Sequence, residues 1–532
     1  MPPIMRFFLP SLLDIVLVAV FIISLSPIRD YDTWWHLRAG QDIISSGGIP
    51  RQDPYSYTAA GKPWVAHEWL SEVIFAGVYS KGGFPLLIFL KALVITVTFG
   101  LLGTILLRKG LSILGTVALL SLAVISSTSF WLDRPQIFTF LFFTFYLLVL
   151  EGHRQSQKIL PLFLLPLLMI FWVNLHGGFV IGLITVVSYL IGQYLSFWSK
   201  KREACAGEGI KTASSESGKW LLLISFAVLA ASLFNPQGLK IFFFVFKTVT
   251  TKSFMTHISE WQAPDLQSWW GYRIFIFLCI ILLALRSKKI APSLGLLFLA
   301  TLHLSLTSLR NIPFFVFTAT LVIADLWPAL TRETAQLNQA DSENKGPLAR
   351  VIRLWFRSFS SNLTQLTLLC NRHLLPVIFF LATGLIFSLY PNLKWGALDL
   401  GSGVEEKNYP LGAVKFIQEE GLAGRFFHPY HWGGYLIFRL YPEHKVFIDG
   451  RADMYGEEFF NEYRRLYHGR EGWREALEKY NIKFILLDKK APLTSVLKET
   501  SDWGVIFSDQ DSIIYQKTEV RGQRTDTTVR RN

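Results

Sequence analysis

FFLPSLLDIVLVAVFIISL, residues 7–25, is an apolar run that is long enough to cross the roughly 30 Å hydrocarbon core of a bilayer. The single charge of Arg6 precedes it, and Ser-Pro and then charged residues follow it without a small-residue cleavage site. This pattern is typical of an uncleaved signal anchor. The whole chain has the same character, because 51% of its 532 residues are hydrophobic and only 17% are charged. A bilayer is the expected solvent.

Ten further apolar runs have a length suited to membrane spans. They fall near 85–107, 111–129, 135–150, 159–175, 178–198, 219–234, 272–285, 290–306, 312–328 and 374–391. With the first run they predict a polytopic α-helical membrane protein of about eleven transmembrane helices.

Basic residues orient these spans, because loops rich in Lys and Arg remain in the cytoplasm. They occupy alternate connections, at Arg6, Arg108, Lys109, Arg154, Lys158, Lys200, Lys201, Arg202, Arg286, Lys288, Lys289, Arg350, Arg353, Arg357 and Arg372. We therefore expect a multi-pass protein of the bacterial inner membrane with a cytoplasmic N-terminus and everything after about Tyr390 in the periplasm. The net charge of +13 is largely this topological signal, and no nucleic-acid partner is expected.

The chain divides into three predicted regions. Residues 1–395 form the transmembrane domain, which includes a long first outer loop at 29–83. Residues 396–517 form a periplasmic α/β domain, because helix-like stretches at 411–420, 457–467, 471–480 and 492–499 alternate with strand-like runs at 425–428, 445–448, 482–487, 503–508 and 512–516. Residues 518–532 form a tail expected to be disordered. The cysteines, Cys205, Cys279 and Cys370, lie near the membrane or on its inner side, so the outer domain has no disulfide.

The most informative segment is RDYDTWWHLRAG, residues 29–40, directly outside the first span. It places Asp30, Asp32, His36 and Arg38 within one or two helical turns, while its tryptophans can lie at the lipid boundary. An acidic pair beside a span can be a simple interfacial cap, but the neighbouring aromatic residues and Arg38 favour a functional role.

At these residues the chain resembles the GT-C superfamily of membrane glycosyltransferases, which use polyprenyl-phosphate sugars. DTWWHLR, residues 32–38, is similar to the Asp, two aromatics, polar residue and Arg that open oligosaccharyltransferase catalytic subunits. HPYHWGGYLIFRL at 428–440 and KVFIDGRADMYG at 445–456 resemble in placement the Trp-Trp-Asp-Tyr-Gly element of the family's outer domain. The family's Asp is absent there.

The resemblance implies transfer of a sugar from a polyprenyl-phosphate donor to a glycan, lipid or protein acceptor at the periplasmic face. Asp32, with Asp30 beside it, is the expected general base. The expected donor-phosphate ligands are Arg38, Arg134, Arg310 and His176. Family members differ in whether a divalent metal assists, and Asp32 with Asp133 could hold Mg or Mn. Each of these residues also has a plain structural reading, as a cap, an interface anchor or a helix end.

The expected acceptor side comprises His36, His67, Glu68, Trp432, Tyr435, Asp449 and Arg451. His67–Glu68 lacks the second His, four residues on, that a zinc-type helix motif requires. Asp449 and Arg451 stand in a glycine turn after a strand, which turn chemistry alone can explain. Asp14 and Lys91 fall inside spans, where charge is costly, and they could pair with each other or line a wet cavity; a structural pair is the expected arrangement.

Two other functional classes remain open. A transporter or flippase for a lipid-linked glycan would place its ionisable groups near mid-membrane, on broken helices of a repeat. In this chain most of them lie at the outer boundary. A non-catalytic envelope assembly protein could keep the same fold without a working acid.

Overall fold

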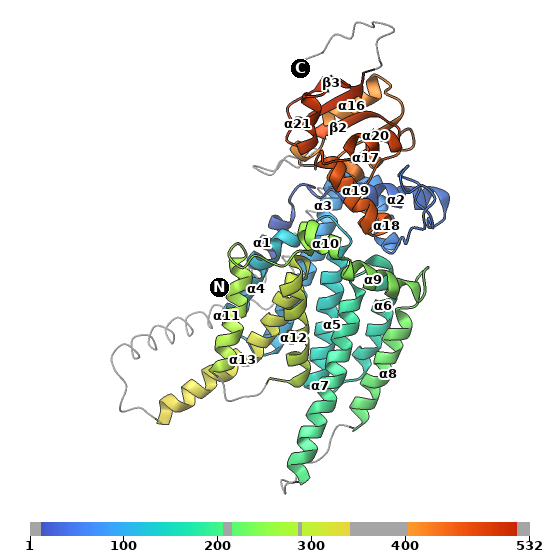
Figure 1. Ribbon diagram of the computed structural model, residues 1–532. Helices are drawn as coiled ribbons and strands as arrows, with labels where there is room; N and C mark the ends of the chain where they lie inside the picture. The colour runs from blue at the N-terminus through green and yellow to red at the C-terminus, as the bar shows by residue number, and fades with distance from the viewer. Residues whose placement is uncertain (1–11, 206–214, 286–289, 341–402, 519–532) are drawn as a thin grey trace, which may run out of the picture.

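Ten apolar helices form a bundle in the part of the chain that the structure describes, which is residues 12–205, 215–285, 290–340 and 403–518 of a computed structural model (Figure 1). They are α1 (Leu12–Ser24), α3 (Trp69–Arg108), α4 (Ile113–Ser127), α5 (Gln136–Ser156), α6 (Leu164–Leu175), α7 (Phe179–Cys205), α8 (Ser215–Ala231), α11 (Trp270–Ala284), α12 (Pro292–Thr307) and α13 (Ile312–Ala340). Five of these helices are long and apolar enough to cross a membrane, and five are shorter.

These ten helices coincide with ten of the eleven predicted spans, so the polytopic α-helical class is confirmed. The remaining run, 374–391, lies outside the described residues, as does most of the tail from 518. Helix α3 begins earlier than expected, at Trp69, and its regular backbone is interrupted at Gly82 and Gly83. Gly83 has a φ of 62°, which favours glycine. The last part of the first outer loop is therefore helical and continues through a kink into a span.

Buried charges join the helices in pairs. Lys91 makes its ion pair with Asp133 (3.0 Å), so the expected pairing of Lys91 with Asp14 is wrong. Asp133 lies in the turn before α5 and reaches Lys91 directly, which satisfies a cation that would otherwise be costly in the bundle. A second cluster connects Lys109, directly after α3, with Glu151 and Arg154 on α5 and Asp325 on α13. Both clusters link helices that are distant in sequence.

The outer domain contains a four-stranded sheet in the order β1-β2-β4-β3. Its strands are β1 (Arg425–Phe427), β2 (Ile482–Asp488), β3 (Trp503–Ser508) and β4 (Ser512–Lys517); β1 and β2 are parallel, and the other pairs are antiparallel. Its helices are α16 (Leu411–Glu419), α17 (Gly433–Leu440), α18 (Ala452–Tyr455), α19 (Glu457–Tyr467), α20 (Trp473–Lys479) and α21 (Pro492–Lys498). The predicted α/β class is confirmed.

The predicted strand at 445–448 does not belong to this sheet. Val446 forms an isolated bridge with Ser56 of the first outer loop, and its N–H donates to the carbonyl of Tyr55 (3.0 Å). The run is buried and rich in residues of high β-propensity, as a strand would be. Its pairing partner, however, comes from a segment about 390 residues earlier. Local pattern cannot reveal such a partner.

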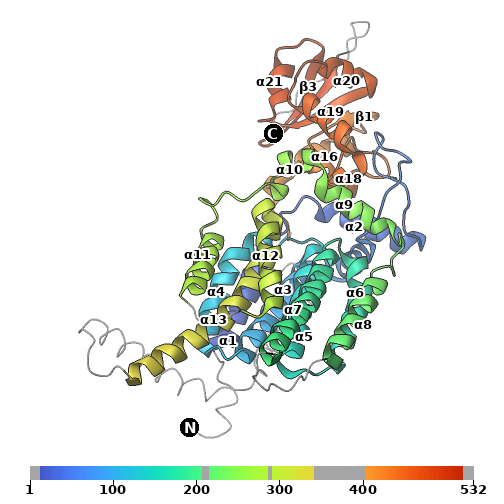
Figure 2. The ribbon, with the colours of Figure 1, turned by 60° about the horizontal axis from the view of Figure 1, so that its bottom comes forward.

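The first outer loop and the outer domain share one hydrophobic core. Helix α2 (Thr33–Ser46) packs against α17, and Figures 1 and 2 show this part of the loop beside the outer domain. Its Trp34 packs edge-on against the rings of Tyr409 and Tyr435, with centroid distances of 5.1 and 4.9 Å, and these two rings also contact each other. Shorter outer elements complete this side of the bundle: α9 (Lys240–Thr250), α10 (Lys252–His257), η4 (Ser259–Trp261) and η5 (Leu309–Asn311). The core therefore fixes α2 relative to the domain above it.

Candidate active site

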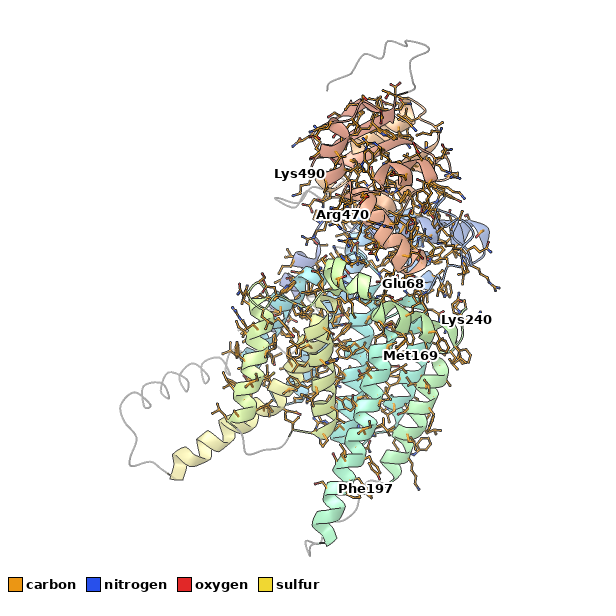
Figure 3. The ribbon with its side chains drawn as sticks, viewed as in Figure 1. Glu68, Met169, Phe197, Lys240, Arg470 and Lys490 are labelled. Carbon is orange, nitrogen blue, oxygen red and sulfur yellow. The ribbon has the colours of Figure 1, made fainter. Side chains whose placement is uncertain are left out.

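A cavity of about 390 Å³ lies where the helices meet the outer domain. Figure 3 shows one of its residues, Glu68, at this junction, while Phe197 lies at the far end of the bundle. Its walls come from the first outer loop, the turns before α5 and α7, the connection that holds α9 and η4, and the outer domain. Charged and polar residues among them include Asp32, His36, His67, Glu68, Arg134, His176, Glu260, Arg310, Arg451 and Asp453.

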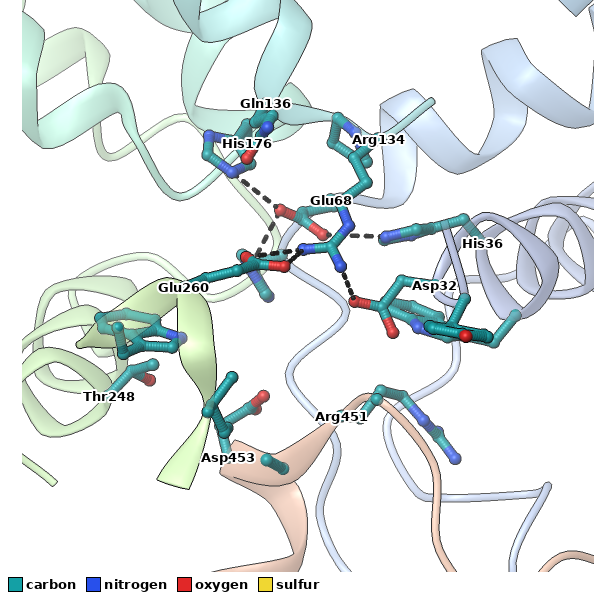
Figure 4. Close-up of a pocket in the computed structure, with 18 of the residues that line it drawn as sticks. Asp32, His36, Glu68, Arg134, Gln136, His176, Thr248, Glu260, Arg451 and Asp453 are labelled. Carbon is teal, nitrogen blue, oxygen red and sulfur yellow. Dashed lines mark hydrogen bonds and ion pairs between the residues drawn. The ribbon is translucent and has the colours of Figure 1, made fainter. Parts of the chain in front are cut away.

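Arg134 connects three carboxylates at one side of this cavity, and Figure 4 shows it with two of them, Asp32 and Glu260. Its Nη2 lies 3.1 Å from Oδ2 of Asp32, and its Nη1 lies 2.8 Å from Oε1 of Glu260. Its Nε is paired with the carboxylate of Asp30, which is buried behind the cavity wall. Each nitrogen of the guanidinium therefore serves a carboxylate from a different position in the chain. Such charge-assisted bonds are stronger and more directional than neutral hydrogen bonds.

Two close backbone approaches hold Asp32 in place. Asp32 precedes the first residue of α2, and α2 packs on α3 where a Cβ on Gly40 would lie 2.0 Å from the carbonyl oxygen of Glu72. A Cβ on Gly450 of the outer domain would lie 1.8 Å from Oδ1 of Asp32. Only glycine permits both contacts. The Asp32 carboxylate is thus held between Arg134 on one side and the Gly450 backbone on the other.

Three histidines surround Glu68 on another wall of the cavity, and Figure 4 shows two of them, His36 and His176, beside it. The Nε2 atoms of His36, His67 and His176 lie 3.6, 3.5 and 3.4 Å from its carboxylate oxygens. The tertiary contacts that bring them together are hydrogen bonds between α3 and the end of α6. The Trp69 indole N–H donates to Oδ1 of Asn174 (2.8 Å), and the Ser71 hydroxyl donates to the carbonyl of Leu175 (2.6 Å).

The environment separates the protonation states of these groups. Burial lowers the pKa of His67, but the charge of Glu68 outweighs it and raises that pKa to about 9. Burial lowers the pKa of His176 to about 3, so this imidazole is neutral. Burial raises the pKa of the Glu68 carboxyl, yet His67 and its neighbours hold it well below the usual range. Glu68 is therefore an ionised carboxylate paired with a charged His67.

Arg310 presents a guanidinium to the cavity from η5. It lies over the indole ring of Trp261, 4.5 Å from the centroid, which is a cation–π arrangement. Among the described residues no carboxylate lies within ion-pair distance of Arg310, whereas Arg134 has three partners. Of these two arginines, Arg310 has the greater capacity for an anionic ligand.

Several predicted residues lie together in this cavity: Asp32, His36, His67, Glu68, Arg134, His176, Arg310 and Arg451. Others lie outside its walls. Arg38 pairs with Asp42 (3.0 Å) and donates to the carbonyl of Tyr441 (2.9 Å). Tyr435 packs on Trp34, and the indole N–H of Trp432 donates to the carbonyl of Asn408 (3.1 Å). Asp449 is completely buried, with its carboxylate bonded to Arg451 and Tyr455.

The arrangement does not fit the expected divalent-metal pair of Asp32 and Asp133. Asp133 is buried and paired with Lys91, and Asp32 is paired with Arg134. Within the described residues no group of three or more His, Cys, Asp or Glu side chains is arranged to hold a metal ion. Each carboxylate of the pair already has a cation as its partner.

Glu260 is a residue of the site to which the sequence analysis assigned no role. It stands in the outer connection 235–271 beside Trp261, but neither its spacing nor its neighbours mark it. Burial raises the pKa of the Glu260 carboxyl, but Arg134 outweighs burial and lowers it. Tyr430 and Asp453 of the outer domain complete the cavity wall. The pairing of Glu260 with Arg134, 126 residues earlier, could be seen only in three dimensions.

No protein-family model and no curated protein matches the sequence. Two solved structures of an oligosaccharyltransferase from Archaeoglobus fulgidus match the fold: AglB in complex with an inhibitory peptide and a dolichol-phosphate, and the apo form. Their TM-scores are 0.51 and 0.50 at 13% sequence identity, and each match covers 89% of this chain and 69% of the other. The chain has a GT-C fold. ArnT from Cupriavidus metallidurans bound to undecaprenyl phosphate is also similar, with a TM-score of 0.45, 13% identity and coverage of 95% and 97%. The GT-C fold that the Asp32 segment predicted is thus confirmed.

Proposed function

We propose that this protein transfers a sugar from a polyprenyl-phosphate donor to an acceptor at the periplasmic face of the bacterial inner membrane. The observation that carries the proposal is the cavity, which places the Asp32 carboxylate and the Arg310 guanidinium in one site beside the helix ends. A base and an anion-binding cation are the two groups that such a transfer requires. The GT-C fold supports the proposal, since one solved neighbour is an oligosaccharyltransferase in complex with a dolichol-phosphate.

In the proposed reaction the acceptor's nucleophilic atom forms a bond to the anomeric carbon of the donor sugar. The bond from that carbon to the phosphate oxygen breaks, and the polyprenyl phosphate leaves. Asp32 accepts the proton that the acceptor loses. Arg134 orients Asp32 by a bond to one of its oxygens, while Arg310 stabilises the charge on the departing phosphate.

The outer domain forms part of the wall where an acceptor would bind. Tyr430, Arg451 and Asp453 line the cavity from this domain, opposite the helix ends. Arg310, by contrast, lies in η5 between α12 and α13, on the side of the cavity that the apolar helices form, and the polyprenyl chain of the donor would remain dissolved in the lipid around such helices. The acceptor, whether glycan, lipid or protein, is therefore expected to bind against Tyr430, Arg451 and Asp453.

The deciding experiment is Asp32→Asn in purified protein. Mass spectrometry follows consumption of lipid-linked sugars that co-purify with the protein, and release of polyprenyl phosphate. Asn is nearly isosteric, so a structural Asp should tolerate it at a cost of about 1 kcal/mol. It cannot accept a proton, and loss of general-base catalysis lowers the rate by roughly a hundredfold to ten-thousandfold.

Asp42→Asn is the matched control, because Asp42 lies on α2, the helix that Asp32 precedes, but pairs with Arg38 outside the cavity. It should retain transfer. Asp30→Asn tests the register of the motif, since Asp30 shares Arg134 with Asp32. Transfer by Asp32→Asn at the wild-type rate contradicts the assignment, and loss in Asp30→Asn alone transfers the role to Asp30.

A further inference from the structure

The three carboxylates that meet at Arg134 come from separate parts of the fold. Asp30 and Asp32 precede α2, whereas Glu260 lies in η4, between α10 and α11. Oxygen-rich clusters of this kind are ordinary ligand sets for divalent cations. Here a guanidinium stands at their meeting point, and its Nε, Nη1 and Nη2 atoms each pair with a different carboxylate.

We propose that Arg134 is the built-in cation of this site and that Asp30, Asp32 and Glu260 bind no divalent metal while it is present. A guanidinium is planar and bonds ligands around its edge, so it holds three carboxylates further apart than one ion would with bonds of about 2.1 Å. The same three carboxylates cannot bond both centres at once.

Arg134 is also fixed from its own side of the site. The Thr33 hydroxyl donates to the carbonyl of Asp133 (3.0 Å), and the Asp133 side chain pairs with Lys91 (3.0 Å). Pro135 follows directly, so the backbone around Arg134 is restricted. Displacement of the guanidinium by a metal would leave a cation in a largely buried position without its partners, which is costly.

This inference deepens the proposed function and, for its catalytic part, rests on it. An arginine remains charged at every physiological pH and cannot be removed by a chelator. The site therefore keeps a positive charge beside the reacting groups without recruiting an ion. Arg134 acts as a positioning residue for Asp32, and Arg310 is left to contact the phosphate.

The test measures Mn²⁺ binding by electron paramagnetic resonance and needs no sugar transfer, so it is independent of the proposed activity. The proteins are full-length wild type, Arg134→Ala, and Arg134→Ala combined with Asp32→Asn. Arg38→Ala is the control, because Arg38 pairs with Asp42 away from the cavity. We expect wild type and Arg38→Ala to bind no specific Mn²⁺. Arg134→Ala should gain one bound ion, which the added Asp32→Asn should remove.

Two results would overturn the proposal. The first is a Mn²⁺ ion bound by the wild-type protein and lost in Asp32→Asn. The second is a folded Arg134→Ala protein that binds none. Where Arg134→Ala does not fold, the comparison of wild type with Asp32→Asn still decides the matter, since equal absence of bound Mn²⁺ supports the built-in cation.

Discussion

Replacing Arg451 with Met should destabilise the contact between the first outer loop and the outer domain. The Arg451 side chain is only 2% exposed, and its Nη2 lies 2.7 Å from Asp449 and 2.8 Å from Asp53. Burial raises the pKa of Asp449, but Arg451 outweighs it and holds that pKa below its ordinary value. Removing one member of a buried ion pair costs about 3–5 kcal/mol, because the remaining charges lose their partner.

The lower end of that range is expected, about 3 kcal/mol, because both carboxylates keep other donors. Asp449 retains the Tyr455 hydroxyl (2.6 Å), and Asp53 retains the N–H of Tyr55 (3.1 Å) and that of Ser56 (3.0 Å). Met preserves the apolar contact with the rings of Tyr55 and Trp64, so the loss is chiefly electrostatic.

Thermal unfolding of the detergent-solubilised protein, monitored by tryptophan fluorescence, measures the effect. Arg474→Met is the matched control, because Arg474 is 57% exposed and lies 4.0 Å from an exposed Asp502. Exposed pairs contribute between zero and about 1 kcal/mol, so its midpoint should remain close to that of wild type. Equal midpoints for Arg451→Met and Arg474→Met would refute the reasoning, since buried and exposed arginines would then contribute alike.

Three further outcomes are expected. Gly450→Ala should displace Asp32 and abolish sugar transfer in the donor-consumption assay. Gly48→Ala is the control and should retain transfer, because no atom lies near its added Cβ. Equal transfer rates for the two variants would disprove the close contact. Since Glu68 raises the pKa of His67 from 6.5 to about 9, the stability that this pair contributes is complete below pH 6.5 and lost as pH rises through 9. The thermal midpoint of His67→Gln should depend less on pH across this window than that of the wild-type protein. An equal pH dependence of the two midpoints would count against the pairing. In a cysteine-free background in intact cells, an impermeant thiol reagent should label Asp509→Cys but not Gln157→Cys; labelling of both contradicts the orientation.

The sequence was sufficient for those parts of the fold that depend on local pattern. Apolar runs of span length predicted the ten described membrane helices, because the bilayer requires each span to be both long and apolar. The alternation of helix and strand patterns in the outer domain predicted its sheet strands for the same local reason. The exception, the run around Val446, pairs with the first outer loop rather than with a neighbouring strand.

The candidate site was predictable only where a chemical group stood out within its own segment. Asp32 and His36 stand in a dense cluster of charge and aromatic rings, and both line the cavity. Arg38 belongs to the same cluster, yet it lies two residues after His36, about 200° further around the helix, so it faces away from the cavity and pairs with Asp42. Composition alone could not show which face of α2 lines the cavity. Contacts with the outer domain, such as the hydrogen bond from Arg38 to the carbonyl of Tyr441, set the orientation of this helix.

The same limit explains why the metal expectation and the observed Arg134 site differ. From sequence, the carboxylates of Asp32 and Asp133 were unpaired groups on one side of the membrane, and a shared cation was a reasonable way to satisfy them. The fold satisfies each of them with a separate cation, Arg134 for Asp32 and Lys91 for Asp133. Because adjacent residues in the turn point to opposite partners, Asp133 reaches into the bundle while Arg134 reaches the cavity. A single turn thus supplies both an anchor in the helices and the positive charge of the site.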